Sequence, residues 1–310
     1  MAPKLPSKIN KPVTEDRPTN WFGRIVTSII IGPVLVLSSA LYRPLFIVLT
    51  LGVTGVANHE FHNLIKILFT GSAKKSHSLT VINQICATQI SLTACLTASL
   101  EYTTFSFLGC FLFLVIYHLV YTSVKEKDNI HIDNFLHIGG CLIGWVWIVM
   151  GLGILNILQK THPCLSSLAI DCVVCADTFA MLIGRPLGKH KISPIISPKK
   201  SWEGLIGGTV IGALFNTGLM MFLRIWLHHI PQYEPLNLFL VSLSGCFIEQ
   251  FGDLLQSYLK RIGRVKDSGT AIPGHGGFLD RICGVLFVAP LFYFLTRTGV
   301  LPPETHIIPR

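Results

Sequence analysis

The chain has 310 residues, of which 50% are hydrophobic and only 13% are charged, and its formal net charge is +9. Because soluble domains carry about 25% charged residues, this composition excludes a soluble globular protein. The excess of positive charge is typical of the cytoplasmic loops of membrane proteins, so we expect membrane lipids and no nucleic acid as partners.

Apolar blocks of roughly 20 residues predict transmembrane helices, because a helix of that length spans the hydrocarbon core and satisfies its own backbone groups. Residues 1–24 are rich in polar residues and lack the apolar core of a signal peptide, so they are predicted to be a flexible cytoplasmic tail. Nine apolar blocks follow, at 25–42, 44–68, 79–98, 103–122, 135–158, 165–183, 204–226, 235–256 and 278–298. We therefore predict an all-α, polytopic membrane protein with about nine transmembrane helices.

The distribution of Lys and Arg predicts the orientation of these helices. With the N-terminus inside, the inside segments hold 18 of the 25 Lys and Arg residues; these segments are 1–24, 69–78, 123–134, 184–203 and 257–277. This bias predicts an N-in, C-out topology, unless 25–42 or 44–68 is not a full span. We divide the chain into the tail, an N-terminal transmembrane region over 25–160 and a C-terminal catalytic transmembrane region over 161–310.

The strongest candidate for chemistry lies around the last two predicted helices. Asp253, Ser257 and Lys260 are spaced i, i+4, i+7 and share one helix face. A basic loop and a glycine-rich turn follow, and Asp280 opens the last helix. Carboxylates on two helices beside basic loops suit Mg²⁺ bound to phosphates, as in phosphoryl or nucleotidyl transfer. The alternative is that they form only ion pairs at helix ends, Asp253 with Lys260 and Asp280 with Arg281.

A second polar cluster combines Asp177, in an apolar block, with the basic segment 184–203. Ionisable residues at membrane depth are candidates for function because burying them is costly. Lys199 and Lys200 are expected either to bind a substrate phosphate or to meet anionic lipid head groups. Ser201 is expected to cap the helix that follows.

Two stretches carry a resemblance to a known family. One contains Ser257-Tyr-Leu-Lys-Arg, Lys266-Asp and Ile272-Pro-Gly-His-Gly-Gly-Phe-Leu-Asp-Arg, and the other contains Ser197-Pro-Lys-Lys-Ser-Trp-Glu-Gly. Together they resemble the phosphatidate cytidylyltransferase (CDP-diacylglycerol synthase) family, most closely its bacterial form. The similarity covers about residues 170–290, and earlier residues match mainly as hydrophobic spans, with Glu60 as a weak anchor.

The resemblance implies that CTP and phosphatidic acid react to CDP-diacylglycerol and pyrophosphate with Mg²⁺, and that the site also holds K⁺. It further implies a homodimer in a bacterial inner or plasma membrane. By position it implies catalytic roles for Asp253, Ser257, Lys260 and Asp280, with both aspartates as metal ligands. The substrate-binding residues that it implies are Asp177, Lys199, Lys200, Arg261, Lys266, Asp267, His275 and Arg281.

Two positions depart from the family pattern. Gln256 stands where the family usually has Glu, and Cys283 stands where it usually has Asp, on the helix face of Asp280. A thiol is a poor ligand for Mg²⁺, whereas the Gln256 carbonyl oxygen remains a suitable one. Glu249 lies one turn before Asp253 on the same stripe, and we hypothesise that it restores part of the lost negative charge as a further metal ligand.

These departures leave a second function open, namely a catalytically impaired family member that acts as a lipid- or nucleotide-binding or scaffold protein. A third function, a transporter or channel, is suggested by the helix count alone. It is disfavoured because Asp253 and Asp280 are predicted near the inside boundary rather than at mid-span, where transported ions are bound.

Overall fold

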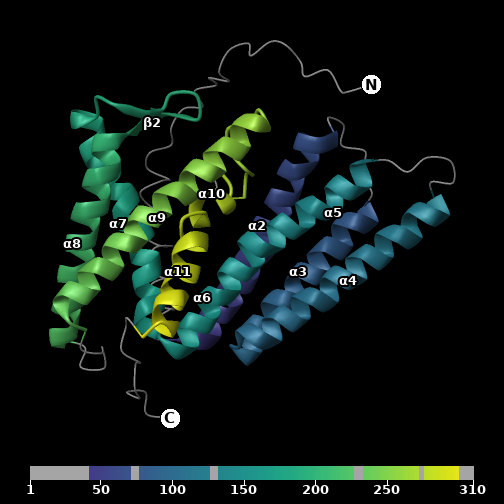
Figure 1. Ribbon diagram of the computed structural model, residues 1–310, viewed down its shortest axis with the longest axis horizontal. Helices are drawn as coiled ribbons and strands as arrows, with labels where there is room; N and C mark the ends of the chain where they lie inside the picture. The colour runs from purple at the N-terminus through teal and green to yellow at the C-terminus, as the bar shows by residue number, and fades with distance from the viewer. Residues whose placement is uncertain (1–41, 71–76, 126–131, 227–232, 272–275, 300–310) are drawn as a thin grey trace.

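The computed structural model describes residues 42–70, 77–125, 132–226, 233–271 and 276–299 (Figure 1). The helices in the first half are α2 (Arg43–Thr70), α3 (His77–Thr97), α4 (Leu100–Lys125), α5 (Ile132–Gly144), a π-helical turn (Trp145–Val149) and α6 (Met150–Thr161). Those in the second half are α7 (Pro163–Leu187), α8 (Trp202–Trp226), α9 (Pro235–Ile262), α10 (Leu279–Ile282) and α11 (Val285–Arg297). A short hairpin of β1 (Lys191–Ser193) and β2 (Ser197–Ser201) joins α7 to α8.

Within the described residues, eight helical spans are long and apolar enough to cross a membrane. Their ends lie within a few residues of eight of the predicted blocks; the span Arg43–Leu68, for example, matches the block at 44–68. The prediction of an all-α, multi-pass integral membrane protein is therefore confirmed. The ninth block, at 25–42, and the tail fall outside the described residues, so the count of nine and the N-in, C-out orientation stay predictions.

The described parts of the segments predicted to lie inside after residue 68 gather at one end of the molecule. Figure 1 shows the β-hairpin at the same end as the C-terminal ends of α2, α4 and α9. The junctions between α3 and α4 and between α6 and α7 lie at the other end (Figure 1). Successive spans, in which α5 with α6 and α10 with α11 each count as one, therefore alternate in direction, as expected for a chain that crosses a bilayer repeatedly.

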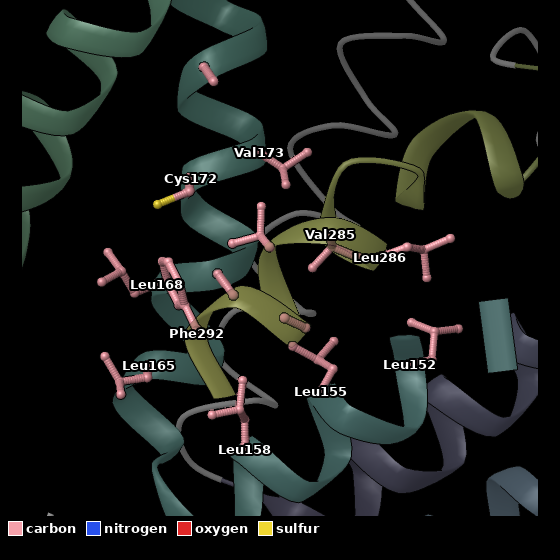
Figure 2. Close-up of a cluster of buried hydrophobic side chains, with 14 of the residues drawn as sticks. Leu152, Leu155, Leu158, Leu165, Leu168, Cys172, Val173, Val285, Leu286 and Phe292 are labelled. Carbon is pink, nitrogen blue, oxygen red and sulfur yellow. The ribbon is translucent and has the colours of Figure 1, made fainter. Parts of the chain in front are cut away.

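The largest core cluster joins α6, α7 and α11 (Figure 2). Leu155 and Leu158 of α6 pack with Leu165 and Leu168 of α7 and with Phe292 of α11, and each of these side chains is at most 2% exposed. Because lipid tails are as apolar as leucine, such helices are held by close van der Waals packing rather than by exclusion of water. This packing fixes α7 and α11, which carry or adjoin the polar residues of both predicted clusters.

The basic segment 184–203, interpreted from the sequence as a loop between two helices, contains regular structure. Helix α7 continues to Leu187, and the chain then forms an antiparallel hairpin in which Lys191 pairs with Ser201 and Ser193 pairs with Ser197. Pro198 is tolerated inside β2 because both strands of a two-stranded ribbon are edges. The predicted role of Ser201 as a helix cap is confirmed, since its Oγ accepts a hydrogen bond from the Gly204 N–H at 3.2 Å.

Candidate active site

Helix α9 carries three of the predicted acidic and amide side chains, together with Gln250, on one face. Glu249, Gln250, Asp253, Gln256 and Lys260 follow one another at spacings of one, three, three and four residues, which is the repeat of a single helical stripe. Glu249, Gln250 and Gln256 are at most 1% exposed, although each bears a polar group. The prediction that Asp253, Ser257 and Lys260 lie on one helix is confirmed.

The first polar group, which we call the Lys200 cluster, consists of Asp177, Lys200, Glu249, Gln250 and Asp253. Lys200 Nζ lies 2.7 Å from Asp253 Oδ2 and donates to Gln250 Oε1 at 3.0 Å. Gln250 Nε2 donates to Glu249 Oε2 at 2.7 Å, and the carboxyl groups of Glu249 and Asp177 are close enough to interact electrostatically. Three carboxyl groups thus surround one ammonium group. The site is therefore rich in oxygen atoms and has more acidic than basic groups.

The protonation of Lys200 follows from this environment. Burial by itself lowers the pKa of the Lys200 ammonium, but the facing carboxylates of Asp253, Glu249 and Asp177 outweigh burial and raise the pKa above its ordinary value. A raised lysine pKa means that the cation persists throughout the physiological pH range. The cation that this ion pair with Asp253 requires is therefore present there, and it is lost as the pH rises through the raised pKa of Lys200.

The second polar group, the Asp280 cluster, forms where α10 meets α9. Asp280 Oδ1 accepts from Lys260 Nζ at 2.7 Å and from Gln256 Nε2 at 3.3 Å. Asp280 Oδ2 accepts from the backbone N–H groups of Ser268 at 2.9 Å and Gly277 at 3.1 Å. The Oε1 atom of Gln256 is buried and has no hydrogen-bond partner among the described residues.

The alternative prediction, in which the two acids form ion pairs within their own helices, is wrong. Asp253 pairs with Lys200 of the hairpin instead of Lys260, and Asp280 pairs with Lys260 instead of Arg281. The helix geometry explains this, because seven residues separate Asp253 from Lys260 by about 10 Å along the axis. Neighbouring residues such as Asp280 and Arg281 point to different sides of a helix and do not face each other. Each acid is therefore held by a cation from a distant part of the chain.

Glu60 of α2 is the residue whose importance was missed. Its buried carboxylate accepts hydrogen bonds from Ser268 Oγ at 3.1 Å, Phe278 N at 3.1 Å and Leu279 N at 3.0 Å. Gly277 packs so closely on this carboxylate that a Cβ atom there would collide with Glu60. Glu60 thus ties the N-terminal half of the protein to the segment that presents Asp280. The signals in the sequence were an acid within an apolar block and a weak family resemblance at this position.

The remaining predicted residues lie around the two clusters. Ser257 is half-buried on α9, and Lys199, Lys266, Asp267 and Arg281 are exposed. Arg261 is also exposed and donates from Nε to the Ile196 carbonyl at 3.1 Å, which joins the end of α9 to the hairpin. His275 lies outside the described residues. The structure therefore gathers the predicted residues along one side of α9 without joining them into one cluster.

A cavity of about 560 Å³ opens beside the Lys200 cluster, between α7, the hairpin and the start of α8. Its size is that of a typical small-molecule site. The charged residues that line it are Asp177, Arg185, Lys191, Lys199 and Lys200. Four cationic groups in one concave site favour a ligand with several negative charges, such as a nucleoside triphosphate.

Comparison with known proteins identifies the family. A sequence profile of the cytidylyltransferase family matches residues 22–298. The chain belongs to this family. Curated relatives named phosphatidate cytidylyltransferase include a protein of Rickettsia prowazekii, 34% identical over 177 residues that cover 57% of this chain and 72% of the relative. The Bacillus subtilis relative is 36% identical over 188 residues, which cover 59% of this chain and 66% of the relative.

Cys283, which stands where the family usually has Asp, lies close to both clusters. Cys283 is 4% exposed, and its backbone packs against Gly252 on α9, where an added Cβ atom would lie 2.6 Å from the Cys283 carbonyl oxygen. Glu249 reaches the same place, because its Cγ atom would lie 2.5 Å from a Cβ atom added to Gly284. The Cys283 side chain interacts electrostatically with Glu249 and Asp253 of the Lys200 cluster and with Lys260 of the Asp280 cluster, so it lies between the two clusters.

Proposed function

We propose that the protein is a CTP-dependent nucleotidyltransferase that converts CTP and phosphatidic acid into CDP-diacylglycerol and pyrophosphate, as a step of phospholipid biosynthesis. The observation that carries the proposal is the cavity with four cationic side chains beside the acidic Lys200 cluster. The names of the curated relatives support the same reaction. The position of the site on helices long and apolar enough to cross a membrane supports a lipid as the second substrate.

In this reaction a phosphate oxygen of phosphatidic acid attacks the α-phosphorus of CTP and forms a new P–O bond. The bond between the α-phosphorus and its bridging oxygen to the β-phosphate breaks, and pyrophosphate leaves with that electron pair. Lys199, Lys200, Arg185 and Lys191 line the cavity and are assigned to the nucleotide phosphates. Their cations neutralise the charge that accumulates on the leaving pyrophosphate, which is the main electrostatic demand of such a transfer.

The residues present fit a magnesium ion. Mg²⁺ prefers oxygen ligands, and typically one or two carboxylates together with substrate phosphates. Asp253 and Glu249, with Asp177 beside them, supply carboxylate oxygens that a single lysine does not neutralise. Asp280 and Gln256 Oε1, which has no hydrogen-bond partner within the part of the chain that the structure describes, supply oxygens at a second position. When bound, Mg²⁺ would withdraw charge from the phosphates, and K⁺ is proposed as a second cation near the same oxygens.

Two residues, Asp280 and Lys260, are assigned to positioning. Asp280 accepts four hydrogen bonds, so its carboxylate is fixed in orientation before any ligand arrives. Lys260 is held by Asp280 next to the exposed basic segment that includes Arg261, Lys266 and Arg281. Ser257, Asp267 and His275 are retained as candidate substrate contacts on the basis of the motif.

The cellular setting is also part of the proposal. We propose that this multi-pass membrane protein resides in a bacterial inner or plasma membrane and that two copies form a homodimer. Light scattering of the protein in detergent tests the second point, since a monomer mass at all concentrations would refute it. Membrane fractionation tests the first.

The function is tested with the purified protein, phosphatidic acid, CTP, Mg²⁺ and K⁺, by measuring pyrophosphate release. Release that requires both substrates is expected, and none in the complete mixture would refute the proposal. The impaired-member alternative predicts binding of CTP without turnover in the same preparation, and a gain of activity from nothing in Cys283→Asp. Transport of substrate into liposomes without chemistry would instead indicate a carrier.

A further inference from the structure

A group of nitrogen and sulfur donors lies on the side of α2 that faces away from the active site. It consists of His62 of α2 with His137 and Cys141 of α5, and His118 of α4 adjoins it. His62, His118 and Cys141 are at most 3% exposed. His62 follows Glu60 by two residues, which is a rotation of about 200° around the helix, so the two side chains leave α2 on nearly opposite faces.

We propose that His62, His137 and Cys141 bind a zinc ion. One ligand atom from each residue lies within 4.8 Å of the others. The two Nε2 atoms of His62 and His137 are 3.4 Å apart, close to the distance of about 3.3 Å that separates two nitrogen ligands on tetrahedral zinc. His137 and Cys141 are four residues apart on α5, the spacing at which two side chains of one helix chelate the same ion.

The hydrogen bonds around the group orient His137 as a metal ligand. His118 Nδ1 lies 3.0 Å from the Leu114 carbonyl, which accepts only, so this nitrogen carries the proton. In a neutral ring the other nitrogen, His118 Nε2, then accepts, and His137 Nδ1, 3.1 Å away, donates to it. His137 Nε2 is then the unprotonated nitrogen of its ring, and it faces His62 Nε2 at 3.4 Å. Histidine ligands of zinc generally donate their second ring N–H to such an outer acceptor.

The donor set selects the kind of metal. Two imidazoles and a thiol prefer zinc or another thiophilic transition metal over Mg²⁺, so this site differs chemically from the oxygen-rich clusters of α9. Lys66 lies close enough to His62, His137 and Cys141 to interact electrostatically with each of them. Lys66 adds positive charge beside the site. One thiolate ligand would offset part of the total charge of Lys66 and a bound zinc ion. The metal would join α2 to α5 and stabilise the helix that presents Glu60.

The direct test is elemental analysis of the full-length protein purified in detergent without chelators. About one zinc per chain is expected, and both Cys141→Ser and His137→Gln should lower the zinc content by more than about fivefold. Cys110→Ser and His162→Gln are the matched controls, because they remove a thiol and an imidazole outside the group and should leave the zinc content unchanged. Equal zinc in wild type and in both site variants, or none in wild type, would overturn the proposal.

A second measurement does not depend on the variants folding. Co²⁺ titrated into metal-depleted wild-type protein should produce a thiolate-to-cobalt charge-transfer band, together with the visible absorption of tetrahedral cobalt. Zn²⁺ added afterwards should abolish both. The absence of a thiolate band would show that His62, His137 and His118 form only a chain of hydrogen-bonded neutral histidines, and would refute the site.

Discussion

Glu60→Gln is predicted to impair catalysis although the residue is assigned no contact with substrate. The substitution keeps the shape of the side chain but replaces one accepting oxygen by an NH₂ group. One of the donors Ser268 Oγ, Phe278 N and Leu279 N then faces another donor. Losing a hydrogen bond to a charged group and leaving a buried N–H unsatisfied costs about 2 kcal/mol or more.

If the whole of this free energy is lost from transition-state stabilisation because Asp280 is displaced, kcat/KM for CTP falls about 30-fold. The assay is initial-rate pyrophosphate release at saturating phosphatidic acid, with thermal unfolding measured on the same preparation. Glu101→Gln, which changes an exposed carboxylate on α4, is the matched control and should behave as wild type. A double-mutant cycle with Ser268→Ala should show coupling between the two sites. A Glu60→Gln enzyme within about twofold of wild type would refute the positioning role.

Three further substitutions test the two clusters. Lys200→Met leaves the partly buried Asp253 carboxylate without its cation and is expected to lower CTP turnover by about 30-fold or more; normal turnover would exclude Lys200 from the site. Glu249→Gln is expected to raise the Mg²⁺ concentration needed for half-maximal activity, and an unchanged magnesium dependence would exclude a ligand role. Gly252→Ala should lower the midpoint of thermal unfolding, because the added Cβ atom meets the Cys283 carbonyl. An unchanged midpoint would show that α9 and α10 adjust freely.

The helices could be predicted from the sequence because the bilayer itself sets the length of an apolar block. The stripe of Asp253, Ser257 and Lys260 could be predicted for a related reason, since residues on one helix obey a fixed period. Both inferences need only local sequence. They succeeded where the chain is regular and failed at the hairpin after Leu187, where two short strands leave no periodic signal.

The partners of the acids could not be predicted, because they come from distant parts of the chain. Lys200 precedes Asp253 by 53 residues, and Glu60 precedes Ser268 by 208 residues. No spacing rule connects such pairs, and they are found only once α2, the hairpin and α9 are placed together. The motif gave Asp253 and Asp280 as functional acids, but only the fold shows that each has its own lysine.

The central claim is that the acids of α9 support nucleotidyl transfer to a lipid. The most direct measurement follows radiolabelled CTP into the lipid phase with purified wild type and with Asp253→Asn, at equal protein and Mg²⁺ concentrations. The account predicts labelled lipid that comigrates with CDP-diacylglycerol for wild type, and a loss of at least about 100-fold for Asp253→Asn with normal folding. Labelled lipid formed equally by both proteins would contradict it.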